Sequence, residues 1–119
     1  MAPVLFFIKL KEQIRIIHWQ TKIYSKHQAL GLTYDELNEL IDSYVEICIG
    51  KHGRFKIEGG AVEFKNIDEL DMNSFLDESI KFLVSLTNTL DTQMDSDLLN
   101  IRDEIMAHLN KLKYLLTLK

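Results

Sequence analysis

Apolar residues recur at helical spacing along most of this chain, and a glycine-containing stretch near its middle interrupts them. From Pro3 to about Thr21 they form two adjoining stripes, which predict a first helix. Proline suits this start, because the N–H that it lacks would have no partner in the first turn. Together the stripes are wider than one neighbouring helix covers, so we expect burial in a bundle core or a contact between subunits. The stripes consist of Phe7, Ile14 and the ring of His18, and of Phe6, Leu10 and Ile17.

The second predicted helix has two possible starting points. Ser25-x-x-Gln28 and Thr33-x-x-Glu36 both fit a capping box, in which side chains satisfy free backbone N–H groups at a helix start. A start at Ser25 places Gly31 inside the helix, at a cost of about 1 kcal/mol. The capping signals alone do not choose between the two.

Around the Gly59-Gly60 pair the pattern changes from helical spacing to alternation. Apolar residues alternate with polar ones on both sides of the pair, which is typical of a β-hairpin. A two-stranded ribbon is only marginally stable alone, so we expect this hairpin to pack on the helices or on another subunit. The alternating residues are Phe55, Ile57, Val62 and Phe64.

Helical spacing returns in the second half of the chain. It predicts a third helix from about Ser74 to Leu90 and a fourth from about Asp97 to Leu118. The four segments together predict an all-α fold, a four-helix bundle that forms a single domain over residues 1–119. Its long connection, at about residues 51–72, joins the second and third helices and is predicted to contain the short hairpin.

Composition narrows the class of protein. The chain has 119 residues, of which 46% are hydrophobic and 27% charged, and this suits one globular domain with its own core. The single cysteine allows no intrachain disulfide, and no signal peptide or membrane span is recognisable, so a cytoplasmic location and no membrane partner are expected. The net charge of -4 argues against broad binding to nucleic acid, which depends on clustered basic residues.

The strongest chemical signal is the series His18, His27, Asp42 and Glu46. If the second helix starts at Ser25, the last three of these residues fall within an arc of about 100° on one side of it. Mixed imidazole and carboxylate ligands suit iron, and two acidic side chains one helical turn apart can bind or bridge a cation. The series therefore predicts a metal site, for iron or another divalent metal.

A purely structural role explains the same residues. In this interpretation Asp42 and Glu46 are solvated or ion-paired, His18 is a hydrogen-bonded core residue and Trp19 is an ordinary packing anchor. The basic residues available for such ion pairs are Lys22, Lys26 and Arg102.

Other candidate residues carry weaker signals. His52 lies between Lys51 and Gly53 and is expected to be an exposed residue rather than a ligand. His108 and Glu104 are spaced for a surface pair on the fourth helix. Cys48 is expected to be a small core residue, because no basic partner or helix N-terminus is apparent that would lower its pKa.

Residues in the first half of the chain resemble the signature of the Dps-type mini-ferritins, which begins with His-Trp and continues to a D-x-x-x-E pair. The resemblance implies a ferritin-like four-helix bundle that binds iron and oxidises Fe(II) with peroxide or oxygen. It also implies a homo-oligomer, in which His18 and His27 of one chain face Asp42 and Glu46 of its partner. The matching residues are His18-Trp19, His27, Tyr34, Asp42 and Glu46.

The chain departs from that family at several points. His18 and His27 are closer together than is usual, Gly31 stands where the family has a further acidic ligand, and no basic tail is seen. In its small size the chain is more similar to ferritin-like proteins encoded by bacteriophages and related bacterial elements. The sequence therefore predicts a ferritin-like metal-binding protein with possible ferroxidase activity. The alternative is an inactive helical interaction protein that keeps the scaffold and works through its apolar surfaces.

Overall fold

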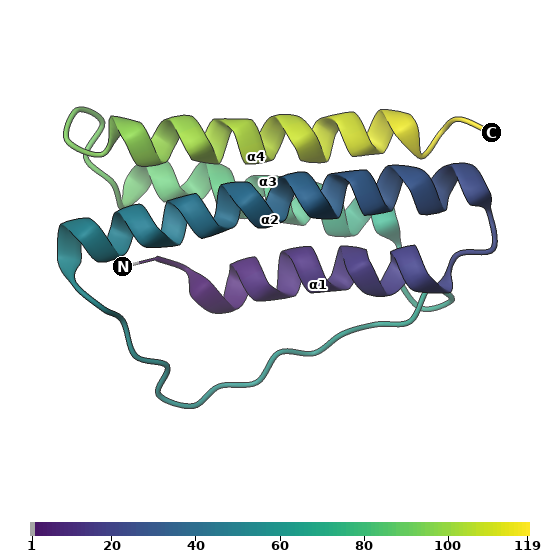
Figure 1. Cartoon of the computed structure of the whole chain (residues 1–119), viewed down its shortest axis with the longest axis horizontal. Coiled ribbons are helices and arrows are strands. Elements are labelled where there is room, and N and C mark those ends of the chain that lie inside the picture. Colours follow the sequence, from purple (N-terminus) through teal and green to yellow (C-terminus); the bar gives the residue numbers. More distant parts are fainter. Residues whose placement is uncertain (1) are drawn as a thin grey trace.

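Four α-helices make up the structure, a computed structural model that describes residues 2–119 (Figure 1). The prediction of an all-α fold with four helices is confirmed. No described helix has an apolar run long enough to cross a membrane. The helices are α1 (Val4–Gln20), α2 (Tyr24–His52), α3 (Met72–Ser85) and α4 (Ser96–Leu115), and the short 3₁₀ turn η1 (Leu86–Asn88) follows α3.

One long connection sets the direction of the helices. α1 and α2 are antiparallel neighbours, and α4 returns antiparallel to α3 (Figure 1). Between these pairs, residues 53–71 run alongside α1 for the length of the bundle, so that α2 and α3 point in the same direction. α2 packs against both α1 and α4 and therefore has neighbours on two sides. The predicted long connection between the second and third helices is confirmed.

The core lies where the apolar stripes of the four helices meet. Tyr44 of α2 is only 1% exposed, and its ring packs edge-on against Phe7 of α1, with 5.1 Å between ring centres. Burial raises the pKa of Tyr44 to about 12, so its hydroxyl stays protonated around neutral pH. The other fully buried large side chains are Leu10, Ile14, Leu30, Leu37, Leu76, Leu83, Leu98, Ile105, Leu109 and Leu112.

α2 begins at Tyr24, next to the first of its two predicted starts, and continues through Gly31 without a break. Ile23 is its N-cap residue, and no side chain caps the helix there. The capping box at Ser25 therefore does not form, although the start that it indicated is nearly right. Burial of apolar side chains such as Leu30 offsets the cost of a helical glycine, since each fully buried leucine contributes about 1.5–3 kcal/mol.

The predicted β-hairpin is wrong, because residues 53–71 contain no strand. Side-chain amides of α1 bind this segment instead of a partner strand. Gln13 accepts a hydrogen bond from the Lys65 N–H and donates one to the Lys65 carbonyl, both at 2.8 Å. Gln20 accepts a bond of 2.8 Å from the Ile67 N–H. The two adjacent glycines do have positive φ, but the segment must span the bundle to reach α3 and so does not fold back on itself (Figure 1).

A buried arginine marks the end of α3, which stops at Ser85, short of the predicted Leu90. Arg102 of α4 donates hydrogen bonds of 2.8 Å to the Leu83 carbonyl and to Thr87 Oγ1. A cation is favourable here, because carbonyl groups at the end of a helix lack partners and carry partial negative charge. Arg102 therefore belongs to the architecture of the bundle.

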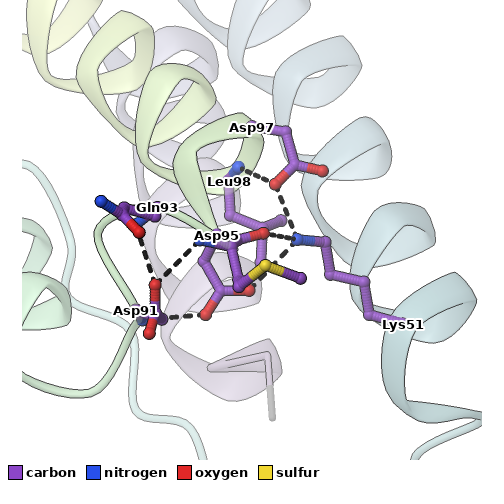
Figure 2. Close-up of polar contacts among 7 residues, drawn as sticks. Lys51, Asp91, Gln93, Asp95, Asp97 and Leu98 are labelled. Atoms are coloured by element: carbon purple, nitrogen blue, oxygen red, sulfur yellow. Dashed lines mark hydrogen bonds and ion pairs between the residues drawn. The ribbon is translucent and has the colours of Figure 1, made fainter.

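An ion-paired cluster joins the end of α2 to the start of α4 (Figure 2). Lys51 Nζ lies 2.8 Å from Asp97 Oδ1, 3.1 Å from Asp95 Oδ1 and 2.6 Å from the Met94 carbonyl. In the turn before α4, the carboxylate of Asp91 accepts a hydrogen bond of 2.8 Å from the Met94 N–H. The last turn of α2 is thus fixed to the loop that begins α4.

Candidate functional site

His18 and His27 form a stacked pair where α1 turns into α2. His18 lies in the last turn of α1 and His27 in the first turn of α2, and the short connection folds the two helices back on each other. Their ring centres are 4.0 Å apart, and the ring planes differ by 14°. The sequence predicts both histidines as metal ligands, and the structure places their rings side by side; metal binding itself stays a prediction.

Each ring of the pair is hydrogen-bonded to the backbone of the other residue. His18 Nδ1 lies 2.7 Å from the His27 carbonyl oxygen, and His27 Nδ1 lies 2.9 Å from the His18 carbonyl oxygen. A carbonyl oxygen can only accept, so both Nδ1 atoms carry the hydrogen. In the neutral rings both Nε2 atoms then keep a lone pair, which is the tautomer that metal-binding histidines commonly have. The close sequence spacing allows this reciprocal bonding.

Gly31 makes room for the His18 ring. It follows His27 by one helical turn, and a Cβ atom at this position would lie 2.7 Å from His18 Cε1 and 3.1 Å from His18 Nδ1. Both distances are shorter than ordinary carbon contacts, which are about 3.5–4.0 Å. An acidic side chain at position 31 would need the space that the imidazole fills. Glycine at position 31 and the position of the His18 ring are therefore two aspects of one arrangement.

The histidine pair borders an open hollow of about 500 Å³. Arg15 lies between two aromatic rings there, with its guanidinium carbon 5.0 Å from the centre of Trp19 and 4.8 Å from that of Tyr34. Trp19 is 65% exposed, so the interpretation of this residue as a packing anchor is wrong. Cation–π contacts of this kind contribute about 0.5–1 kcal/mol at exposed sites.

Glu12 binds both the Arg15 guanidinium and the Tyr34 hydroxyl at this hollow. It accepts a hydrogen bond of 2.8 Å from Arg15 Nε and one of 3.1 Å from the Tyr34 hydroxyl. Partial burial, and then the neighbouring carboxylate of Glu12, raise the pKa of Tyr34 above its ordinary value. The phenol therefore acts as a hydrogen-bond donor and stays protonated around neutral pH.

Asp42 and Glu46 lie at the other end of the α1–α2 pair. Both are exposed, and they border a smaller hollow with Ile8 and Lys11 of α1. Asp42 is about 22 Å from His27 along the axis of α2, at 1.5 Å per residue. Among residues 2–119, no group of three or more His, Cys, Asp or Glu side chains could hold a metal ion. One chain therefore brings the ligand candidates together as two separate pairs.

The two pairs lie on one surface, which we call the α1–α2 face. On α1, Lys11, Arg15 and His18 follow one another at intervals of three and four residues, so they share one side of the helix. Both hollows are lined by residues of α1 and α2. On α2 the corresponding series is His27, Gly31, Asp35, Asn38, Asp42 and Glu46.

The ion pairs that a structural role predicts for the two carboxylates do not form in the described chain. Arg102 donates instead to the Leu83 carbonyl of α3 and to the Thr87 hydroxyl of η1. No ion pair within residues 2–119 involves Asp42 or Glu46. In one chain these carboxylates are therefore solvated.

The remaining candidates have structural roles. His108 pairs with Glu36 of α2, with Nδ1 2.5 Å from Oε2, so the predicted pair with Glu104 is wrong. A partner across the helix interface lies closer than the exposed residue on the same helix. Burial raises the pKa of the Cys48 thiol, which agrees with its expected place in the core. His52 is exposed at the end of α2, as predicted.

Comparison with known proteins leads to a family without an assigned activity. No curated protein and no solved structure matches the chain. A family model does match it, over residues 18–116, and the match begins at His18 of the stacked pair. The matched region includes the whole of α2, α3 and α4. The chain belongs to the family described as a family of unknown function, DUF5856.

Proposed function

We propose that this protein is a ferritin-like metal-binding protein, in which His18 and His27 each supply one neutral imidazole ligand to a divalent transition metal ion. The observation that carries the proposal is the reciprocal hydrogen bonding of the two rings, since both Nδ1 atoms donate to backbone carbonyls and both Nε2 lone pairs stay available. Fixed imidazoles of this tautomer fit Fe, Co, Zn and related ions. The bundle topology supports the proposal, because ferritin-like folds also have one long crossover connection.

The stacking geometry means that the pair alone does not complete a site. An imidazole binds a metal in the plane of its ring. The planes of His18 and His27 are within 14° of parallel and the ring centres are 4.0 Å apart, so one ion does not lie in both planes. Each ring therefore supplies one ligand to an ion, and the remaining ligands must come from other residues.

Asp42 and Glu46 of a second copy of the chain are the ligands that complete the site in this proposal. α1 and α2 are antiparallel (Figure 1). The histidines lie at one end of the α1–α2 face and the carboxylates border the hollow at the other. A two-fold axis between the ends places the histidines of one chain against the carboxylates of its partner. Asp42 and Glu46 have no ion-pair partner within residues 2–119, which leaves both carboxylates available to a metal ion at such a contact.

Fe(II) is the ion that mixed imidazole and carboxylate ligands favour in this proposal. These ligands support the binding of Fe(II). Oxidation of the bound Fe(II) is an extension of the same proposal. The iron is then the substrate of the protein.

Metal titration of purified protein tests the proposal. We expect the wild type to bind Fe(II) or Co(II) under anaerobic conditions, and we expect His27→Ala and Glu46→Ala to lose that binding. His52→Ala and Glu104→Ala are matched controls, because both residues are exposed and lie off the α1–α2 face. Equal binding by all five proteins, or no binding by the wild type, would reject the metal site.

Sedimentation of the same proteins tests whether a second copy of the chain completes the metal site. We expect a dimer or a larger oligomer, weakened by charge reversal in Asp42→Lys. A wild type that stays monomeric while it binds metal would reject the shared site and keep the histidine ligands.

A second candidate function, a helical interaction protein without a metal, is favoured by the apolar surface at the α1–α2 corner. Trp19, Tyr24 and Leu32 are 65%, 70% and 50% exposed. Large exposed apolar groups that lie together are typical of interaction sites. The two candidates separate in the metal titration, because the interaction protein binds no metal before or after substitution of His27.

A further inference from the structure

We propose that Gly31 is a positioning residue that decides which ions the histidine pair takes. It keeps the space in which the His18 ring lies, and it thereby makes this end of the α1–α2 face a nitrogen-donor site. The ligands assigned are the divalent ions that prefer imidazole, such as Fe(II), Co(II), Ni(II), Cu(II) and Zn(II), ahead of Mg(II), Ca(II) and Mn(II). This inference rests on the proposed function for its choice of ligand and on the metal-free structure for its geometry.

The steric argument begins with the fixed position of the His18 ring. It is stacked on His27 at 4.0 Å and bonded through Nδ1 to the His27 carbonyl at 2.7 Å. A Cβ at position 31 would lie 2.7 Å from His18 Cε1, a distance that requires a shift of the ring or of the helix. The backbone of α2 is held by its own hydrogen bonds, so the ring is the part that moves. Its movement breaks the stack and the Nδ1 bond together.

A second glycine in α2 provides the comparison. Glycine in the middle of a helix costs about 0.5–1 kcal/mol relative to alanine. Gly50 has no atom within 4 Å of an added Cβ, so alanine there gains helix stability without a contact. Gly31 has the same intrinsic cost but meets His18. Only the effect of alanine at position 31 is therefore expected to depend on His18.

The side chain at position 31 also decides which donor atoms are available to an ion. A longer side chain at position 31, one turn after His27, would point toward the pair and displace the His18 ring. A carboxylate there would replace a nitrogen ligand with oxygen, which suits harder ions. With glycine, the two Nε2 atoms are the donors at this end, and ions that bind imidazole are favoured.

A double-mutant cycle tests the positioning role without any metal. Gly31→Ala is made both in the wild type and in the His18→Ala variant. Gly50→Ala, made in the same two backgrounds, is the matched control. The free energy of unfolding is measured by urea unfolding in the presence of a chelator. We expect Gly50→Ala to have the same effect in both backgrounds. We expect Gly31→Ala to be more favourable in the His18→Ala background, which removes the clash. An identical effect of Gly31→Ala in both backgrounds would overturn the positioning role.

Two further measurements separate positioning from a general loss of structure. Nitrogen-15 NMR of the imidazoles is expected to show both rings as Nδ1–H tautomers in the wild type, with the His18 signal changed in Gly31→Ala while circular dichroism keeps its helical signal. Co(II) affinity is expected to fall about 10–100-fold in Gly31→Ala, the range found when groups that orient a ligand are lost. An unchanged His18 signal or an unchanged Co(II) affinity contradicts the proposal.

The ligand class is tested by competition in the wild type. Co(II) and Zn(II) are expected to displace Mn(II) and not to be displaced by Mg(II). Mn(II) bound as tightly as Co(II) overturns the assigned class. A wild type that binds none of these ions overturns the proposed function and this ligand class, whereas the metal-free cycle still decides the role of Gly31.

Discussion

The two ends of the α1–α2 face differ in how many partners their polar groups have within one chain. At the histidine end, both rings donate to backbone carbonyls, and Arg15 and Tyr34 share the carboxylate of Glu12. At the other end, Asp42 and Glu46 are exposed and have no ion-pair partner in the described part of the chain. The first end is organised by the chain itself, whereas the second is available to something outside it.

The largest expected effect concerns the core that the two ends share. Leu30 precedes Gly31 in α2 and Ile41 precedes Asp42, and the two side chains are 1% and 4% exposed. Leu30→Ala and Ile41→Ala are each expected to lower the free energy of unfolding by about 2–5 kcal/mol, because each leaves a cavity in a packed core. Urea unfolding measures both. A much smaller cost at Ile41 would mean that the core is not continuous under both ends.

The next largest expected effect compares the stability that one residue from each end of the α1–α2 face contributes. His18→Ala is expected to lower the free energy of unfolding by about 1–3 kcal/mol, because the His27 carbonyl loses its side-chain donor and the ring stack is lost. Asp42→Ala is expected to stay within about 0.5 kcal/mol of the wild type, as is usual for a solvated surface residue. His52→Ala serves as the control for loss of an exposed histidine. Equal effects of the first two substitutions would remove the contrast between the ends.

Acid unfolding reports on the carboxylates that have partners within the chain. Backbone N–H groups hold the pKa of Asp91 and of Asp95 below their ordinary range, and the Lys51 ammonium does so for Asp97. A lowered folded pKa contributes stability above the ordinary carboxyl value of about 3.9, and this contribution is lost as pH falls through the folded values. The pKa of Lys51 is shifted in the opposite direction. Its hydrogen bond to Asp97 raises its pKa, so its contribution is complete below about 10.4 and is lost as pH rises beyond that.

Thermal unfolding across acidic pH measures the contribution of these carboxylates. Asp95→Asn is expected to flatten the decline of the midpoint below about pH 4, because one group that loses its proton on folding is gone. A decline below about pH 4 that Asp95→Asn leaves unchanged would mean that the hydrogen bonds to Asp95 do not lower its pKa.

Much of the fold was predictable because apolar spacing reports burial directly. The four helices and the long connection follow from where side chains can be buried, whereas the sequence left open whether α2 continues through Gly31. Helix ends were less predictable, since Arg102 binds the Leu83 carbonyl near the end of α3 from a distant part of the sequence. The β-hairpin failed for a similar reason. Alternation and a glycine pair describe local preference, whereas the route to α3 and the amide of Gln13 decide the conformation.

The sequence predicts one metal site from His18, His27, Asp42 and Glu46, whereas the described chain brings these residues together as two separate pairs. Helical spacing places Asp42 next to Glu46, and a short turn brings His18 close to His27. Two features had no clear signal in the sequence. The space that Gly31 leaves for His18 depends on how closely α1 approaches α2, and so does the contact of Arg15 with Tyr34. The spacing of Glu12, Arg15 and Trp19 on one side of a helix was the one local sign of this network.

The smallest expected effect is a change in titration at the histidine end. Burial and then Glu12 raise the pKa of Tyr34, so the folded chain holds this proton more tightly than the unfolded chain. The resulting stability is present below the ordinary tyrosine value of about 10 and is lost as pH rises through the folded value. Glu12→Gln is expected to move the pKa of Tyr34 toward its ordinary value without reaching it, because burial remains. Tyrosinate absorbance against pH measures the shift, with Tyr34→Phe to identify the signal and Glu39→Gln as an exposed acid of α2 for control. The same titration in wild type and Glu12→Gln would mean that this carboxylate does not act on the phenol, and the histidine end would then be less fully organised by its own chain than its hydrogen bonds indicate.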